Sequence, residues 1–448
     1  MKKYDVFVIG SGMAGMTVAN KCASSGLKVG VTDELPFGGT CALRGCDPKK
    51  VIIGATEVRD FAMRLKGKGI DTIPDVNWQD VMVFKQSFVD AMPPKIEKGY
   101  KHSGIDTYHT SARFLSKNTL MVGTDTVQAD KIVIATGSKP RVLDFEGGNL
   151  ALSSTDFLNL KELPQSLLFI GGGYIAFEFA HIAARFGANV TIVHRGKRPL
   201  ENFEQDIVNH LIDATKELGI KLVLETEVSK IRKEDNNFLV TGISKGKEIT
   251  YQTEAVFNSA GRPPVIFDLD LEKANIPFSK KGITVNEYLQ STSNPNVYVG
   301  GDAADSRGLP LTPVAVMEGH IVASNIIKGN SKKVNYPPMP SVVFTLPTMA
   351  AVGLTEVEAK TQKIDYQVNY NKVGNWFNAE RLNVKEYAFK TIIDRKNQSI
   401  LGAHLIGPNA EETINLFALA IKTKMEVNEL RTMIFTYPTL SSDIPHML

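Results

Sequence analysis

The sequence predicts an α/β fold made of two Rossmann-like domains and a C-terminal α+β domain. Two segments carry the first part of this prediction, because each reads as an apolar strand, a glycine-rich turn, a helix and a second strand. The first segment covers residues 4–32 and the second covers residues 166–193. The third observation is a mixture of strand and helix patterns after the proline-rich stretch 335–340, with a strand expected at 388–393 and a helix at 411–424.

Composition and charge are those of an ordinary globular protein. The 448 residues include 51 basic and 48 acidic side chains, which gives a formal net charge of +3. This small charge argues against a nucleic-acid or membrane partner, and no apolar run reaches the roughly 18 residues of a transmembrane helix. The length suggests about three domains. Three cysteines are too few for a disulfide framework, which predicts a reducing, cytoplasmic location.

The first glycine-rich turn has the spacing of a dinucleotide fingerprint. In Gly10-x-Gly12-x-x-Gly15, the first glycine permits the tight turn, the second lets the backbone approach a pyrophosphate, and the third lets the helix pack close to the strand. The helix N-terminus then offers unpaired N–H groups to the phosphates. Asp33 ends the next strand, where an acidic residue accepts hydrogen bonds from the ribose hydroxyls.

The second turn, Gly171-x-Gly173-x-x-Ala176, has the same context but a different following strand. A basic turn occupies the place of the acidic residue that would bind an unphosphorylated ribose. Its polar residues are His194, Arg195, Lys197 and Arg198. Because cations bind a 2′-phosphate through charge-assisted hydrogen bonds, we expect NADPH in preference to NADH. The alternative is a solvated basic turn.

Cys41 and Cys46 form a close pair within residues 38–50. At the start of a helix they can close a small disulfide, and the helix N-terminus and Arg44 would favour a thiolate that acts as a redox nucleophile. Two buried cysteines in a loop are the alternative. Arg44 is expected to stabilise the Cys41 thiolate, to attract an anionic substrate or to be only a surface cation. We expect no metal site, because no second CxxC or HxxxH supplies ligands. Cys22 is expected to be a small buried apolar residue.

Residues 38–50 resemble the GGTCxxxGCxPxK motif of the flavoprotein disulfide reductases, the group that contains glutathione reductase, lipoamide dehydrogenase and mercuric reductase. The resemblance extends over essentially the whole chain. Its further motifs are Ala135-Thr136-Gly137, Val297 to Asp302, Val342 to Thr345, Val352 to Glu356, residues 401–404 and residues 406–410.

The resemblance implies that the first fingerprint binds FAD, with Asp33 on the adenosine ribose and Asp302 on the ribityl chain. The implied FAD residues are Gly10, Gly12, Gly15, Asp33, Gly39, Thr40, Lys50, Ala135, Thr136, Gly137, Gly301 and Asp302. The implied NADPH residues are Gly171, Gly173, Ala176, Glu178, Arg195, Lys197, Arg198 and Gly261. Lys50 and Glu178 match the family's ion pair beside the flavin N5, where a lysine stabilises the anionic reduced flavin.

The implied mechanism passes electrons from NADPH to FAD and then to the disulfide through Cys46, which releases Cys41 to attack the substrate. The resemblance also implies a homodimer whose C-terminal domain completes the partner's site. The expected FAD domain covers residues 1–142 and 263–335, with an NAD(P)H domain at 143–262 and a dimerisation domain at 336–448. We expect residues 68–100, with Trp78 and Pro93-Pro94, to form a loop beside the substrate cleft.

The C-terminus departs from the family pattern. Glutathione reductases and lipoamide dehydrogenases carry His-Pro-Thr-x-x-Glu, whereas this chain reads Tyr437-Pro438-Thr439-Leu440-Ser441-Ser442. A tyrosine, with a pKa near about 10, donates a proton but is a poor base at neutral pH. Tyr437 is therefore expected either to act as a weak acid or only to pack at the dimer interface. A further hypothesis is that His446 and Asp443 replace the missing pair.

These features predict an NADPH-dependent, FAD-containing oxidoreductase that reduces a low-molecular-weight disulfide such as glutathione disulfide. The alternative substrate is a small thiol-reactive electrophile or metal ion, which needs little proton transfer. Delivery of a metal ion is hard to see, because no cysteine follows Cys46. Lipoamide dehydrogenase is disfavoured, because it predicts an acidic residue in place of His194 and a C-terminal histidine. A flavin-containing redox sensor with slow turnover is disfavoured, because the pairs Cys41/Cys46 and Lys50/Glu178 are both intact.

Overall fold

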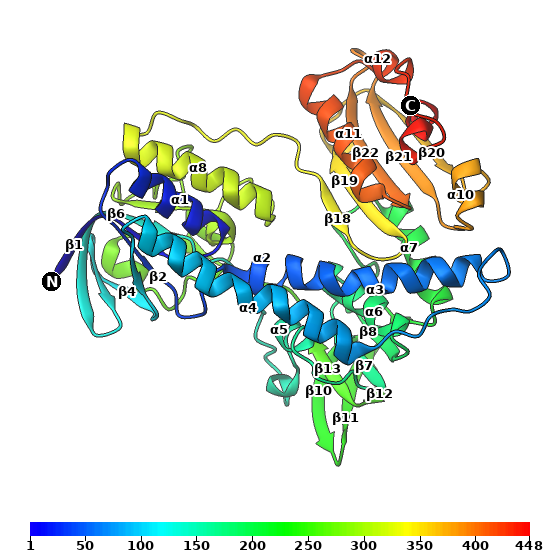
Figure 1. Ribbon diagram of the computed structural model, residues 1–448, viewed down its shortest axis with the longest axis horizontal. Helices are drawn as coiled ribbons and strands as arrows, with labels where there is room; N and C mark the ends of the chain where they lie inside the picture. The colour runs from blue at the N-terminus through cyan, green and yellow to red at the C-terminus, as the bar shows by residue number, and fades with distance from the viewer. The chain divides into compact units, whose positions relative to one another are not determined.

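A computed structural model describes all 448 residues, which divide into two compact units (Figure 1). The first unit comprises Met1–Val51, Val83–Arg141 and Arg262–Tyr336, and the second comprises Ile52–Met82, Val142–Gly261 and Pro337–Leu448. Three of these divisions lie within one residue of the expected domain boundaries. Two points differ from the expectation. Ile52–Met82 clusters with the second unit, and the expected NAD(P)H and dimerisation domains fall together in that unit.

The first unit is built on a seven-stranded sheet. Strand order is β3 (Asp106–Tyr108), β2 (Val29–Thr32), β1 (Lys2–Ile9), β6 (Asp125–Ile134), β5 (Thr119–Val122) and β4 (Ala112–Ser116), and β16 (Val297–Val299) pairs with the end of β6. Ile9 lies opposite both Thr32 and Ile134 in parallel ladders, so β1, β2 and β6 end at the same edge. The residues that follow them, Gly10, Asp33 and Ala135, are therefore brought together at that edge.

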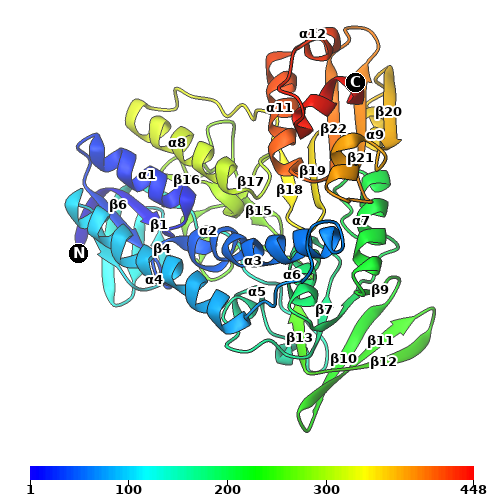
Figure 2. The ribbon, with the colours of Figure 1, turned by 45° about the vertical axis from the view of Figure 1, so that its right-hand side comes forward.

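Helices cover this sheet. In both ribbon views α1 (Met13–Ser24) lies beside α8 (Thr312–Lys328) (Figures 1 and 2). The short helix α2 (Gly39–Arg44) is followed at once by α3 (Cys46–Leu65). The remaining small elements of this unit are η2 (Leu271–Ala274), β14 (Phe278–Ser279), β15 (Gly282–Thr284), η3 (Gly301–Ala303) and β17 (Ala304–Asp305).

The expectation of a loop at residues 68–100 was wrong, because most of it is helix α4 (Trp78–His102). Pro93 and Pro94 lie inside the helix and remove two backbone N–H donors. The apolar residues at helical spacing outweigh this loss, since Val81, Ile96 and Tyr100 are buried.

The second unit contains a parallel sheet of the expected Rossmann type. Its order is β13 (Ala255–Asn258), β7 (Ser166–Ile170), β8 (Asn189–Val193) and β9 (Lys221–Val223). Helices α6 (Tyr174–Arg185) and α7 (Gln205–Glu217) alternate with these strands. The antiparallel sheet β10 (Glu227–Glu234), β11 (Asn237–Ser244) and β12 (Lys247–Thr253) extends from it (Figure 2). The minor elements are η1 (Gly148–Leu150) and α5 (Ser154–Phe157).

The C-terminal part of the second unit is an antiparallel sheet with α11 (Ala410–Thr423) packed on it, in agreement with the expected α+β domain (Figure 1). The buried core includes Phe389, Ile414 and Phe417. Strand order is β18 (Ser341–Val343), β19 (Thr348–Gly353), β22 (Ile400–Gly407), β21 (Ala388–Asp394) and β20 (Tyr366–Lys372). The other elements are α9 (Glu356–Thr361), α10 (Phe377–Arg381), α12 (Val427–Arg431) and η4 (Leu440–Met447). None of the helices in the protein has the length and apolar character that a membrane span requires.

Candidate active site

The first fingerprint is a place where three backbone segments meet closely. Gly10 has a φ of +102°, and a Cβ on it would lie 2.3 Å from the carbonyl oxygen of Ala135. A Cβ on Gly39, whose φ is +68°, would lie 2.5 Å from the Cα of Gly12. The start of α2 therefore packs directly on the turn between β1 and α1, and only glycine permits this approach.

Asp33 is oriented by the same turn. Its Oδ2 accepts hydrogen bonds from the backbone N–H of Ser11 at 2.8 Å and from the Ser11 hydroxyl at 2.7 Å, while Oδ1 accepts one from the N–H of Leu35 at 3.0 Å. Gly12, the N-cap of α1, makes no side-chain capping bond. The helix N–H groups therefore remain available to an anion, and the carboxylate is placed for a ribose beside them.

Two further carboxylates lie in the first unit near the end of β16. Asp302 accepts a hydrogen bond from the hydroxyl of Ser138 at 2.7 Å. Glu318, which the sequence analysis did not identify, accepts one from the N–H of Gly301 at 2.6 Å, and burial raises the pKa of Glu318. The carbonyl oxygen of Gly137 accepts a hydrogen bond from the N–H of Val265. The glycine turn, the α1 N-terminus and these carboxylates fit an FAD molecule, and Thr40, Lys50 and Thr136 belong to the same unit.

Cys41 and Cys46 lie on consecutive helices and both carry free thiols. Cys41 is in α2, and Cys46 begins α3 after a break at Gly45. The two thiols are hydrogen-bonded to each other. Cys46 Sγ lies 3.7 Å from the hydroxyl of Thr312, at the start of α8, and Cys41 Sγ lies 3.8 Å from Oδ1 of Asp47. The pair was predicted from its spacing, whereas Thr312 and Asp47 were not. A carboxylate inside the cysteine motif was the available signal for Asp47.

The environment separates the two thiols electrostatically. The hydrogen bond from Cys41 lowers the pKa of Cys46 to about 6, and the Thr312 hydroxyl and the charge of Lys49 act in the same direction against burial. The same hydrogen bond raises the pKa of Cys41, as do burial and the negative charge of Asp47. At neutral pH the dithiol state therefore has its negative charge on Cys46 and its proton on Cys41.

Cys22 and Arg44 are two further residues of this region whose pKa values are shifted by their surroundings. Cys22 is fully buried in α1, which confirms the expectation of a buried apolar residue, and burial raises its pKa to about 12. Arg44 is half-buried, and burial lowers its pKa, while Asp33 raises it and Arg262 lowers it. Arg44 is thus coupled to the carboxylate of the fingerprint.

The second fingerprint repeats the geometry of the first. Gly171 has a φ of +113°, and a Cβ on it would lie 2.4 Å from the carbonyl oxygen of Ser259. Gly173 is the N-cap of α6 without a side-chain capping bond, so this helix also presents free N–H groups. The side chain of His194 lies against the turn, with Nδ1 3.1 Å from the N–H of Gly172. Gly261 follows β13 with a φ of +116°.

Glu178 is 1% exposed in α6, and its Oε1 accepts a hydrogen bond from the N–H of Phe344 at 2.9 Å. This bond attaches the nucleotide-binding part of the second unit to the segment that follows β18. Lys50 belongs to the first unit. Its pairing with Glu178 stays a prediction.

The C-terminal segment is held by a buried carboxylate. Asp443 accepts hydrogen bonds from Asn378 at 3.0 Å and from the hydroxyl of Tyr387 at 3.0 Å, and burial raises its pKa. This carboxylate anchors η4. Tyr437 is 73% exposed, with its ring centroid 6.5 Å from that of Phe377. The hypothesis that Asp443 and His446 form an acid–base pair loses support, because both Asp443 oxygens are used for anchoring.

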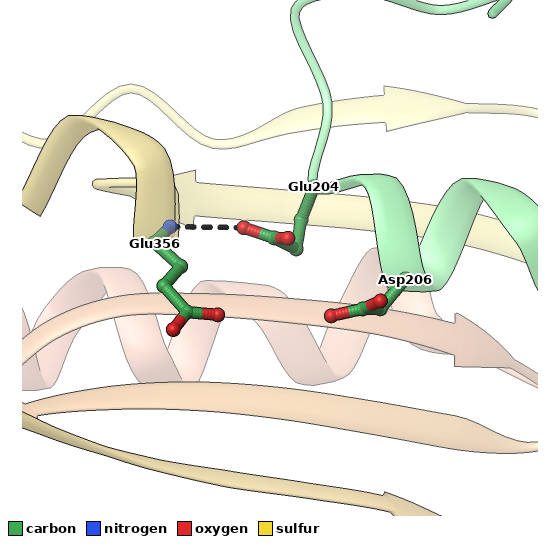
Figure 3. A group of neighbouring side chains, drawn as sticks. All are labelled: Glu204, Asp206 and Glu356. Atoms are coloured by element: carbon green, nitrogen blue, oxygen red, sulfur yellow. Dashed lines mark hydrogen bonds between the residues drawn. The ribbon is translucent and has the colours of Figure 1, made fainter. Parts of the chain in front are cut away.

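A second carboxylate group, Glu204, Asp206 and Glu356, joins α7 and α9 within the second unit (Figure 3). Glu204 also accepts a hydrogen bond from the N–H of Glu356 at 2.9 Å. The Lys390 ammonium lies 3.0 Å, 2.6 Å and 2.5 Å from oxygens of these three carboxylates in turn. Because Lys390 already supplies a central cation, the group is an ion-pair network that joins the nucleotide-binding part to the C-terminal sheet.

Comparison with known proteins identifies the family. Residues 4–319 match the pyridine nucleotide-disulphide oxidoreductase family, and residues 339–448 match its dimerisation domain. The chain is 31% identical over 451 residues to a glutathione reductase of Burkholderia cepacia, covering 99% of this chain and 98% of that protein. The chain therefore belongs to the pyridine nucleotide-disulphide oxidoreductases, which are FAD-dependent enzymes that use a pyridine nucleotide.

Two other relatives extend this comparison. An uncharacterized 19.7 kDa protein in a mercuric resistance operon of Staphylococcus aureus is 54% identical over 180 residues, which is 40% of this chain and all of that protein. The Cu(II) complex of RclA, an HOCl-induced flavoprotein disulfide reductase from Escherichia coli, superposes with a TM-score of 0.88 at 27% identity, covering 100% of this chain and 99% of that chain. The predicted fold class and enzyme class are confirmed.

Proposed function

We propose that the protein is a homodimeric, NADPH-dependent disulfide reductase that passes electrons through FAD and the Cys41–Cys46 pair to a low-molecular-weight disulfide. The observation that carries the proposal is the dithiol itself, in which Cys46 begins α3 with a lowered pKa and Cys41 keeps its proton. A pair with one thiolate and one thiol is suited to thiol–disulfide exchange, because the thiolate resolves the mixed disulfide that the other sulfur forms.

FAD held by the first fingerprint would supply the hydride and electron-transfer chemistry that connects the nicotinamide with the disulfide. The glycine turns bind the pyrophosphates and Asp33 binds a ribose. Asp302 would hold the ribityl chain, and Lys50, oriented by Glu178, would stabilise negative charge on the reduced flavin. Cys46 would be the sulfur that receives the electrons, and Cys41 would be the sulfur that attacks the substrate. Tyr437 would complete the partner's site, either as a proton donor or only by packing at the dimer interface.

The preference for NADPH rests on the turn after β8. Arg195, Lys197 and Arg198 follow strand β8, and His194 directly after this strand takes the place of a carboxylate. A 2′-phosphate placed there would gain charge-assisted hydrogen bonds from these cations. The carboxylate of Glu201, which lies 3.9 Å from His194 Nε2, is exposed and follows the basic turn. The matching site in the first unit has Asp33 and suits the unphosphorylated ribose of FAD.

The homodimer is supported by the dimerisation domain and by its surface. Large apolar side chains are exposed on this domain, among them Ile434 at 96%, Tyr437 at 73% and Phe377 at 54%. Exposed apolar groups of this size on one domain are typical of a protein–protein interface. A mass of about twice the 49.1 kDa chain in light scattering would support the dimer. The cytoplasmic location, inferred from the three cysteines, stays a prediction.

A second candidate substrate is a thiophilic metal ion. It is favoured by the relative from a mercuric resistance operon and by the structural relative solved with Cu(II). The site itself supplies only the thiols of Cys41 and Cys46, since Cys22 is buried. The metal ion would therefore bind directly at the redox pair.

The test is NADPH consumption by the flavin-containing enzyme with glutathione disulfide as sole acceptor, beside a Cys41→Ser control. Rapid turnover that the control abolishes supports the proposal. If turnover is absent while NADPH still bleaches the flavin, the disulfide assignment fails and Hg(II) and Cu(II) become the acceptors to measure. If NADH serves as well as NADPH, the nucleotide assignment fails.

A further inference from the structure

The first turn of α3 places a carboxylate beside the thiol that attacks the substrate. Asp47 follows Cys46 directly, and its Oδ1 lies 3.8 Å from Cys41 Sγ, with the thiol as donor. The contact depends on the break at Gly45, which has φ −151° and ψ −110° and separates α2 from α3. Asp47 is exposed and Cys41 is half-buried, so the two groups meet at a surface that a small substrate can reach.

The surrounding groups determine which of the two sulfurs keeps its proton. The hydrogen bond with Cys46 and burial keep the proton on Cys41, and Asp47 adds to this effect. Lys49 and the Thr312 hydroxyl favour the thiolate of Cys46. The single Cys41 proton therefore has two acceptors within reach, the Cys46 sulfur and the Asp47 carboxylate, while the negative charge resides on Cys46.

Cys41 must lose this proton when it attacks a disulfide, because the thiolate is the nucleophile. The leaving thiolate of an alkyl disulfide must then gain one. A C-terminal histidine would serve both needs, but the chain has Tyr437 at that position, and a tyrosine is a poor base at neutral pH. A group that accepts and returns a proton is required, and Asp47 is within reach of the sulfur.

We propose that Asp47 is the acid–base residue of the oxidative half-reaction, acting on the Cys41 sulfur of its own chain. The inference rests on the proposed function, since it names how that site reduces a disulfide. As Cys41 Sγ bonds to one substrate sulfur and the S–S bond breaks, the Cys41 proton passes to Asp47 and then to the departing thiolate. The Cys46 thiolate next attacks Cys41 Sγ, which closes the Cys41–Cys46 disulfide and releases the second substrate thiolate. The two electrons of the dithiol have then reduced one disulfide to two thiols, with one further proton taken from solvent.

The alternative role for Asp47 is structural, because an acidic residue in the first turn of a helix stabilises it through the helix dipole. Asp80 occupies the corresponding first turn of α4 and is also exposed. Asp80→Asn is therefore the matched control, since it removes a first-turn carboxylate that has no thiol to serve. Asp47→Glu keeps the carboxylate and tests for rescue.

The experiment compares two probe disulfides in single turnover with the prereduced holoenzyme. Bis(2-hydroxyethyl) disulfide releases a basic alkyl thiolate that needs a proton, whereas 5,5′-dithiobis(2-nitrobenzoate) releases an acidic aryl thiolate that does not. Asp47→Asn is expected to slow reduction of the alkyl disulfide by about 30-fold or more. Reduction of the aryl disulfide should slow much less. Asp47→Glu should recover part of the rate with the alkyl disulfide. Tyr437→Phe should reduce that rate by less than Asp47→Asn does.

Equal losses on both probes, no loss on either, or a selective loss in Asp80→Asn or Tyr437→Phe would overturn the inference. A second measurement does not depend on turnover. In a Cys46→Ser background, the pH midpoint for alkylation of Cys41 by iodoacetamide should fall by about half a unit to one unit in Asp47→Asn, because a neighbouring negative charge is removed. An unchanged midpoint would overturn the inference. If the wild-type enzyme reduces neither probe but the midpoint shifts, the proposed function fails while the Cys41–Asp47 coupling is upheld.

Discussion

His194 Nδ1 accepts a hydrogen bond from the backbone N–H of Gly172 at 3.1 Å. Its other ring nitrogen lies 3.0 Å from the carbonyl oxygen of Arg198, which can only accept. These partners require a neutral ring with the proton on Nε2. In the first unit, Asp33 accepts from the N–H of Ser11 at 2.8 Å in the same place. A neutral ring thus replaces a carboxylate at the position where the nucleotides differ.

This relationship predicts the effect of restoring the acid. His194→Glu should lower kcat/KM for NADPH by about 10- to 100-fold, because a carboxylate would repel the 2′-phosphate and withdraw the basic groups beside it. The value for NADH should rise or stay unchanged. His194→Gln, which remains neutral and can accept the Gly172 N–H, should keep the preference for NADPH. Steady-state kinetics with both nucleotides check this, and an unchanged ratio in His194→Glu would contradict it.

The pKa of Cys46 should depend on the hydrogen bond from residue 41. Because that bond lowers the pKa of Cys46 to about 6, the thiolate is expected to be present above pH 6 and lost below it. Cys41→Ala removes the donor and should raise the pKa of Cys46 towards the ordinary value of about 8.5. Cys41→Ser keeps a hydroxyl donor and should hold the pKa low. Thiolate absorbance against pH in the reduced proteins distinguishes the two variants, and equal midpoints would disprove the role of the bond.

Gly39 should be essential for binding the flavin. Gly39→Ala places a Cβ 2.5 Å from the Cα of Gly12 at a φ of +68°, so the fingerprint turn must move. The variant should be purified with a markedly lower ratio of flavin to protein, measured by absorbance. Gly54→Ala is the control, because its Cβ would meet nothing within 4 Å. Full flavin occupancy in Gly39→Ala would show that the turn tolerates the displacement.

Lys390 should contribute strongly to the stability of the second unit. Its side chain is 3% exposed, and Glu204 beside it is 5% exposed, so Lys390→Met would leave buried negative charge without a cation. The free energy of unfolding should fall by about 3 kcal/mol, measured by denaturant titration. Lys385→Met removes an exposed cation paired with Glu217 and should leave stability unchanged. A small effect at Lys390 would mean that the three carboxylates are solvated in solution.

Local features of this site could be read from the sequence, while longer-range partners could not. Gly10, Gly12, Asp33 and the cysteine pair were identified because their spacing alone defines a strand–turn–helix unit. Thr312 was missed because it lies 266 residues from Cys46 and reaches it only through the packing of α8. The loop expected at residues 68–100 was wrong for the opposite reason, since a strong local signal, the proline pair, was overridden by the burial of one face of α4.

The two nucleotide-binding turns, the cysteine pair and the tyrosine at position 437 could be identified from the sequence, because they depend on residue type and short spacing. The tertiary structure decided what surrounds them. Parallel register brought Gly10, Asp33 and Ala135 to one sheet edge, and the break at Gly45 turned Asp47 towards Cys41. Charge and proton position at Cys41 and Cys46 follow from those neighbours, since a thiol's pKa is set by burial, hydrogen bonds and nearby charges that no spacing along the chain encodes.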